Sequence, residues 1–179
     1  MNEPLKDLGF WSSYPSLYEK AARIQKECFP YSPEEKGALF YALEVCGEVG
    51  ELLNVCKKII RTSDREKASS LRLKAFPEEA ADCAIALSML SQAEGLMPRE
   101  TEYAFPVEDG GFHPLLIALA EAASGLYAAA WKNAVTAEGI SSALSVLYAL
   151  SRVMNCDLAG AVNEKLDKIA VRALEKHYD

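Results

Sequence analysis

The sequence predicts an all-α protein, a helical bundle of about six helices. Apolar residues recur with the 3.6-residue period of a helix along most of the chain, and alternating, strand-like runs are scarce. Half of the 179 residues are hydrophobic and a quarter are charged, which is the composition of a globular chain. This length fits one domain, or two small repeats fused around one core.

The first two helices are predicted from the N-terminal third of the chain. Apolar residues on one side favour a helix over about 15–28, which residues 29–33 interrupt. Ser32 is suited to be the next N-cap, with Pro33 at the first helical position and Glu35 completing a capping box. An apolar stripe then continues this second helix to about Ile60.

A basic, polar segment separates the second helix from the third. Residues 61–75 carry several cations and few apolar positions, so we expect a mobile loop there. Pro77, followed by Glu78 and Glu79, is typical of a helix start, because acids are stabilised near the positive end of the helix dipole. This third helix is expected to reach about residue 94 and to end at Gly95.

The C-terminal half is predicted to contain three more helices. Residues 96–112 are rich in proline and glycine and are expected to form a linker. Helices are expected over about 114–133 and 137–155. Asp157 can cap a sixth helix that reaches Lys176.

A partial internal repeat relates two pairs of these helices. Residues 119–133 are similar to 43–58, and 139–158 are similar to 78–96, in their small and apolar positions. Most acids of the first copy are absent from the second. Either the second pair is a degenerate repeat, or two Ala/Leu-rich amphipathic helices look alike by chance, and the sequence leaves both open.

These elements define one domain, residues 1–179. Within it we expect a motif-bearing helical hairpin over 36–95, a degenerate repeat or insert over 113–155, and a C-terminal helix over 156–177.

Composition excludes several classes of function. The formal charge of −7 argues against a sequence-independent nucleic-acid binder, which needs clustered cations to replace phosphate counterions. No continuous apolar run approaches the roughly 20 residues of a membrane span, and residues 1–10 lack a secretory signal, so we expect a cytoplasmic protein with no membrane partner. The five cysteines form no CxxC pair and are expected to be buried thiols; with only His113 and His177 present, a zinc site is disfavoured.

An acidic constellation carries the functional signal. Glu44, Glu48 and Glu51 follow at i, i+4 and i+7, and therefore share one face of a helix. Like charges at this spacing repel, and Gly47 and Gly50 between them each cost about 1 kcal/mol relative to Ala. We interpret these glycines as admitting a neighbouring helix or ligand, because they have no side chain.

The third helix supplies matching acids. Glu79 and Asp82, at i and i+3, also share a face. Two packed helices lie about 8–10 Å apart, so four carboxylates can point into one space. A hard cation with a preference for oxygen ligands would neutralise them, which predicts Mg²⁺, with Mn²⁺ as an alternative, at Glu48, Glu51, Glu79 and Asp82. The alternative is that these acids only form solvated helix faces, and no Glu-x-x-His pair supports a di-iron site.

These residues resemble the MazG-like family of the all-α NTP pyrophosphohydrolases, a superfamily that includes dimeric dUTPases and phosphoribosyl-ATP pyrophosphatases. The family's E-x-x-E, spacer, E-x-x-D pattern is matched by Glu48–Glu51, a spacer over 52–78, and Glu79–Asp82. "GEVGELLNVCKK" is similar to the family's motif helix, and "DLAGAVNEKLDKIAVR" to its C-terminal ending. The similarity covers about 36–95 and 156–173; the intervening 96–155 depart from the minimal pattern.

The resemblance implies a Mg²⁺-dependent enzyme that cleaves a nucleoside triphosphate into the monophosphate and pyrophosphate, as nucleotide-pool house-cleaning. It implies a homodimer or higher homo-oligomer, and leaves open a phosphoribosyl-ATP pyrophosphatase or a non-catalytic regulatory or assembly protein derived from the family. Glu48 or Glu44 would activate the water. The substrate-binding candidates that the resemblance implies are Lys57, Lys58, Asn163, Lys165 and Arg172. The basic segment at Arg61, Arg65 and Arg72 could cover the triphosphate, and Trp11, Tyr127 or Trp131 could stack on a base.

Overall fold

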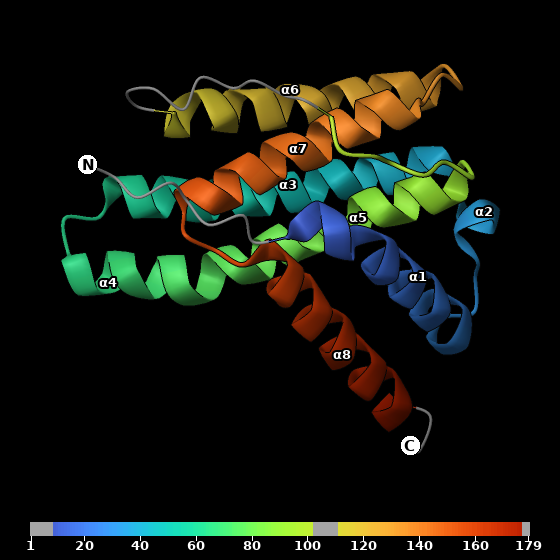
Figure 1. The fold of residues 1–179 in the computed structure, drawn as a ribbon, viewed down its shortest axis with the longest axis horizontal. Helices are drawn as coiled ribbons and strands as arrows, with labels where there is room; N and C mark the ends of the chain where they lie inside the picture. Colours follow the sequence, from blue (N-terminus) through green and yellow to red (C-terminus); the bar gives the residue numbers. More distant parts are fainter. Residues whose placement is uncertain (1–8, 102–110, 177–179) are drawn as a thin grey trace.

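The computed structural model describes residues 9–101 and 111–176, and over these ranges it contains helices and connections but no strand. The all-α prediction is confirmed (Figure 1). The elements in chain order are α1 (Phe10–Cys28), α2 (Pro33–Lys36), α3 (Ala38–Arg61), α4 (Arg65–Ser70), the π-helical turn η1 (Leu71–Ala75), α5 (Phe76–Ala93), α6 (Phe112–Trp131), α7 (Ala137–Val153) and α8 (Leu158–Lys176).

Four of these helices form a bundle around the main core. α3 packs on α5 and on α6, while α7 packs on α5 and on α6, so that each helix has two neighbours. α1 and α8 pack against each other and against α5, on the side of α5 away from α6 (Figure 1). α5 is therefore the central helix, and its buried positions follow one another with few gaps.

α1 begins earlier than predicted, because its first turn is buried. Phe10 and Tyr14 are almost completely buried, and the Phe10 ring stacks on Tyr148 with 5.4 Å between ring centroids. Pro15 was expected to start the helix but lies inside it, where it donates no hydrogen bond. Burial of two aromatic rings, at roughly 2–3 kcal/mol each, offsets that loss.

The second predicted helix is divided in two. The capping box at Ser32 is confirmed: the Glu35 backbone N–H donates to the Ser32 hydroxyl, and the Glu35 carboxylate accepts from the Ser32 N–H at 2.7 Å. α2 then ends after one turn at Gly37, whose φ of 79° favours glycine. α3 begins at the next residue and carries the acidic motif.

The prediction of a loop over 61–75 is wrong. Asp64 caps α4 by accepting from the N–H groups of Glu66 and Lys67, and α4 continues through η1 into α5. The polar composition was interpreted as a loop, but these residues form an exposed N-terminal extension of a buried helix. Such an extension needs a cap rather than an apolar face.

The C-terminal helices agree with prediction to within about two residues. Asp157 caps α8, since its carboxylate accepts from the Gly160 N–H at 3.0 Å. In the predicted linker, residues 96–101 are non-helical, while the rest of it up to 110 and the end of the chain after 176 lie outside the described residues.

One described helix, α6, is long and apolar enough to cross a membrane by length and composition alone. The sequence-based expectation was that no segment would meet this test. α6 includes Glu121, and its inner face packs on α3 and α7 as a bundle helix, so the evidence for a span is weak.

Candidate metal centre and adjoining cavity

The acidic motif lies where α3 and α5 pack together. Val45, Val49 and Leu52 are buried in the core and fix the rotation of α3. With this rotation the intervening Glu48 and Glu51 lie at the edge of the contact between α3 and α5, half-buried and exposed respectively. The apolar stripe therefore determines where the carboxylates point.

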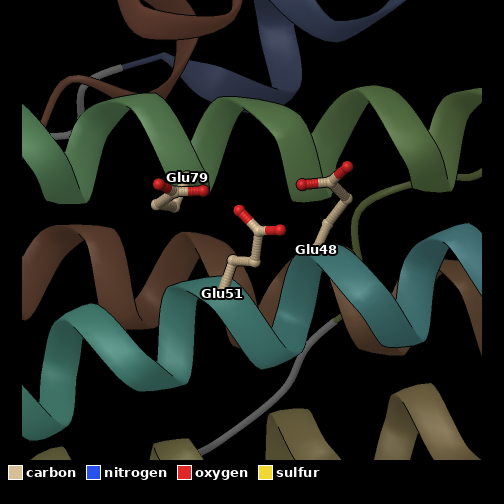
Figure 2. Close-up of side chains that lie close together, drawn as sticks. All are labelled: Glu48, Glu51 and Glu79. Atoms are coloured by element: carbon tan, nitrogen blue, oxygen red, sulfur yellow. The ribbon is translucent and has the colours of Figure 1, made fainter.

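α5 supplies the opposing acid in the same way. Phe76, Ala80 and Ala81 are fully buried, and Glu79 between them is half-buried at the surface of α5 that faces α3. Figure 2 shows Glu48 and Glu51 rising from α3 towards Glu79 on α5. One carboxylate oxygen from each of these glutamates lies within 4.8 Å of those of the other two.

Burial and mutual repulsion disfavour negative charge on this cluster. Burial raises the pKa of Glu48 to about 7, and the charges of Asp82, Glu51, Glu44 and Glu79 add to the rise. Burial likewise raises the pKa of Glu79, followed by repulsion from Glu51 and Asp82. A divalent cation between these carboxylates would remove the repulsion that raises both pKa values.

Asp82, the fourth predicted ligand, is held by a cation of this chain. Its carboxylate accepts a hydrogen bond from the Lys165 ammonium of α8 at 2.5 Å, and both side chains are about one-fifth exposed. Burial raises the pKa of Asp82, and Lys165 opposes that rise. Asp82 borders the cluster without belonging to the group of three that lie within 4.8 Å.

The donor set fits a hard divalent cation. The three glutamates offer only oxygen atoms, which Mg²⁺ and Mn²⁺ prefer. Among the described residues no ion pair involves Glu48, Glu51 or Glu79, although the charge of Lys165 partly opposes the rise in the pKa of Glu79. Glu48 and Glu51 come from one rigid helix and Glu79 from its neighbour, so their spacing is fixed by the core.

A cavity of about 460 Å³ adjoins the cluster. Its lining includes the acids Glu44, Glu48 and Asp82 and the aromatic residues Tyr31 and Phe40. Its apolar surfaces come from α1, α5 and α8 and include Ile24, Ile85, Ala86, Met89, Leu166 and Ile169. The acids therefore open onto a mainly apolar space large enough for a small organic molecule.

The aromatic wall of this cavity was missed at the sequence level. Phe29 and Tyr31 belong to the segment between α1 and α2, and Phe40 and Tyr41 to the first turn of α3. The Lys36 ammonium lies 4.0 Å from the centroid of the Tyr31 ring. The available signal was two aromatic residues beside two prolines in a helix interruption, a combination that a simple connection does not need.

The cations predicted for the substrate are scattered, and only Lys165 lies beside the acids. Lys57 and Lys58 are exposed on α3, and Lys58 follows Glu51 by two helical turns, about 10 Å along the axis. Arg172 is exposed on α8, where its charge acts on Glu78. The Asn163 side chain accepts from Lys20 at 2.6 Å and so is directed to α1.

The other predicted contacts also lie away from the cavity. Trp11 packs against Phe10 and Tyr14 at the start of α1, and Tyr127 and Trp131 are exposed on α6. Arg61, Arg65 and Arg72 are exposed on α3, α4 and η1. Gly47 and Gly50 admit no close neighbour, since a Cβ at either would meet no heavy atom within 4 Å.

Fold and geometry define a helical bundle with a carboxylate cluster that adjoins an aromatic cavity through Glu48. In comparisons with known proteins, no family model, no curated protein and no solved structure matches this chain.

Proposed function

We propose that this protein is a Mg²⁺-dependent nucleoside triphosphate pyrophosphohydrolase, which cleaves an NTP or dNTP to the monophosphate and pyrophosphate. The observation that carries the proposal is that Glu48, a member of the three-glutamate cluster, also lines the aromatic cavity. A nucleoside triphosphate needs both parts, because its base is flat and apolar on its faces whereas its phosphates are polyanionic. The resemblance of the motif to the MazG-like family supports the choice of reaction.

The cavity suits the nucleoside end of such a substrate. Tyr31 and Phe40 line the cavity with aromatic rings, each with the Lys36 ammonium over one face, at 4.0 Å and 5.3 Å from the ring centroids. Base–aromatic stacking contributes about 1–3 kcal/mol per base in proteins that bind single strands. Gln25 donates from Nε2 to the Tyr31 carbonyl at 2.8 Å, which leaves its Oε1 lone pairs for a donor on the base. The cavity therefore combines stacking surfaces with a polar group that can orient a ring.

The carboxylates suit the phosphate end only with a cation. Glu48, Glu51 and Glu79 would hold Mg²⁺, with Asp82 at the border of the site, and Mg²⁺ there would neutralise phosphate oxygens and lower the pKa of a water. Lys165, beside Asp82, adds a fixed positive charge within the same region. Without the cation, an acidic cluster would repel a triphosphate.

The chain's own residues would handle the proton. Hydrolysis forms a bond from a water oxygen to the α-phosphorus, breaks the bond from that phosphorus to the bridging oxygen, and releases a proton from the water. Glu48 is the first candidate acceptor, because its side chain belongs to the cation site and also lines the cavity in which the substrate would lie. Glu44, one helical turn away on the same cavity wall, is the second candidate.

A nucleotide panel tests the proposal. Purified protein is incubated with each NTP and dNTP in Mg²⁺ or in EDTA, and pyrophosphate and monophosphate are measured. We expect Mg²⁺-dependent release of both products from at least one nucleotide, and its loss in Glu48→Gln. Glu78→Gln is the matched control, since Glu78 lies next to Glu79 but pairs with Lys168 at 3.1 Å.

Two outcomes would contradict the proposal. One is the absence of pyrophosphate release from every nucleotide in a folded, Mg²⁺-loaded sample, which would favour a non-catalytic protein. The other is equal turnover by Glu48→Gln and the wild type, which would mean that a different site releases the pyrophosphate.

A further inference from the structure

Two pairs of helices in the bundle bury their residues in matching registers. Five of the eight buried positions of α3 recur on α6, each 74 positions later. Tyr41, Val45, Val49, Leu52 and Cys56 correspond to Leu115, Leu119, Ala123, Leu126 and Ala130, which are all the buried positions of α6. This agreement extends over more than four helical turns. It concerns which face of each helix is buried in the core.

α5 and α7 agree in the same way, at a spacing of 60 positions. Eight buried positions of α5 correspond to eight positions of α7 that are also buried. The α5 residues are Ala80, Ala81, Cys83, Ala84, Ala86, Leu87, Leu90 and Ser91, and their α7 counterparts, in the same order, are Ile140, Ser141, Ala143, Leu144, Val146, Leu147, Leu150 and Ser151. The two spacings differ by 14 residues, which is the length of the segment 62–75 that contains α4 and η1. The first pair thus has an extension where the second has a short turn.

The ends of α5 and α7 have the same backbone geometry, a common helix ending that α6 also has at Asn133. Gly95 and Asn155 both have positive φ, 63° and 55°. The Gly95 N–H donates to the Gln92 carbonyl, and the Leu96 N–H donates to the Ser91 carbonyl. At the corresponding positions 60 residues later, the Asn155 N–H donates to the Arg152 carbonyl and the Cys156 N–H donates to the Ser151 carbonyl.

The packing of the four helices is also reciprocal. α3 contacts α6 and α5 contacts α7, while each pair is held together internally by α3 with α5 and α6 with α7. Figure 1 shows the α6–α7 pair lying across the α3–α5 pair. Two related hairpins joined by an approximate two-fold axis would contact one another in this manner.

We propose that the α6–α7 hairpin is a second copy of the α3–α5 hairpin, and that it keeps the frame of a metal site whose ligands have been lost. The positions that correspond to Glu48, Glu51, Glu79 and Asp82 are Ala122, Gly125, Gly139 and Ser142. Each has the burial class of its counterpart: half-buried, exposed, half-buried and half-buried. A Cβ at Gly139 would lie 3.4 Å from the Leu126 side chain, so this position faces α6 as Glu79 faces α3.

The inference deepens the proposed metal centre and rests on it for the chemistry of the ligands. It assigns one such centre per chain to the α3–α5 hairpin and makes the α6–α7 hairpin its structural counterpart. Restoring the lost carboxylates should then create a second site for the same class of ion, a divalent cation that prefers oxygen.

The test is a titration of the full chain with Mn²⁺, in which calorimetry measures the number of ions bound. The variant Ala122→Glu/Gly125→Glu/Gly139→Glu restores the three positions that correspond to the glutamate cluster. A Cβ at Gly125 would meet no heavy atom within 4 Å, so a side chain fits there. The control Ser124→Glu/Ala128→Glu/Ala137→Glu adds the same charge to the same helices outside the register.

We expect the restored variant to bind one more Mn²⁺ per chain than the wild type and the control to bind the same number as the wild type. A restored variant that binds no more ions than the control would overturn the inference. If the wild type binds no ion while the restored variant binds one, the proposed function fails and the inference stands. If neither binds Mn²⁺, both fail.

Circular dichroism of each variant reports whether the bundle has folded. If the triple variant does not fold, Ala122→Glu/Gly125→Glu alone places two carboxylates on one helix, at the spacing of Glu48 and Glu51. It should bind the additional Mn²⁺ at least about tenfold more weakly than the intact centre, as expected when a ligand is missing. Binding no stronger than in Ser124→Glu/Ala128→Glu would overturn the inference.

Discussion

The α3–α5 hairpin and the α6–α7 hairpin pack alike but differ in charge where they face outward. Leu87 and Leu147, at corresponding positions, are both completely buried. At the positions of the cluster, the first hairpin has carboxylates whereas the second has alanine, glycine and serine. The comparison teaches that the packing of the core and the residues at the cluster positions can vary independently. The packed interior constrains side-chain volume, while the partly exposed cluster positions accept either acids or small residues.

The largest difference between the hairpins should appear in catalysis. Glu51→Gln should lower Mg²⁺-dependent pyrophosphate release by at least about 100-fold, because it removes a proposed ligand. Asp82→Asn should lower it by about 10–100-fold, the cost typical of residues that border the ligands. Ser142→Ala, at the position that corresponds to Asp82, should leave release unchanged. Steady-state kinetics on all three variants, each checked for folding, measures the contrast. Wild-type turnover in both acid variants would exclude the site.

Equal packing should give equal stability effects in the two hairpins. Leu87→Ala and Leu147→Ala should each cost about 2–5 kcal/mol, because each leaves a cavity in the same shared core. Urea unfolding of both variants should remain a single transition when it is monitored by circular dichroism and by tryptophan fluorescence. Two separate transitions in Leu147→Ala would mean that the hairpins fold independently, and the comparison would need revision.

The shifted pKa of Glu48 should make stability depend on pH through the first hairpin. The pKa of Glu48 in the folded chain, about 7, lies above its ordinary value of 4.5, so the folded state binds the proton more tightly. Without divalent cations, the free energy of unfolding should therefore fall as pH rises from about 4.5 through about 7. Solvent screening of this half-exposed group limits the change to on the order of 1 kcal/mol.

Glu48→Gln should make the free energy of unfolding nearly independent of pH over this range. In the wild type, Mg²⁺ should restore the stability that is lost as pH rises. Thermal unfolding at pH 5 and pH 8, with and without Mg²⁺, measures both effects. A wild-type profile that rises over this range without Mg²⁺ would contradict the electrostatic account of the cluster.

The smallest effect concerns the two matching helix ends. Gly95→Ala should cost about 1–2 kcal/mol, because a side chain at positive φ is strained. Asn155→Gly should change stability by less than about 0.5 kcal/mol, because asparagine already tolerates this conformation. Urea titrations of both variants measure the difference. A large loss of stability in Asn155→Gly would show that the asparagine side chain makes a stabilising contact of its own at this turn.

Much of the fold was predictable because each signal was local. The capping box at Ser32 and the cap at Asp157 depend only on residues three positions apart, and both are present. The split at Gly37 and the helical extension before Phe76 were not predictable in this way. They depend on where neighbouring helices leave room, which is a property of the packed chain.

The candidate site was predictable only in part for the same reason. Helical spacing was enough to bring Glu48 and Glu51 onto one face, and packing of α3 on α5 then adds Glu79. Neither spacing nor composition indicates that Lys165 of α8 reaches Asp82, or that Tyr31 and Phe40 wall a cavity beside the acids. These contacts join residues from distant parts of the chain and arise only when α1, α2 and α8 pack on the bundle.

Anomalous diffraction from crystals soaked in Mn²⁺ tests the central claim most directly, because it locates the ion. The account predicts a peak between α3 and α5, within bonding distance of carboxylate oxygens of Glu48, Glu51 and Glu79, and its loss in Glu51→Gln. A soaked crystal with no peak at these side chains, or with the same peak in Glu51→Gln, would contradict it.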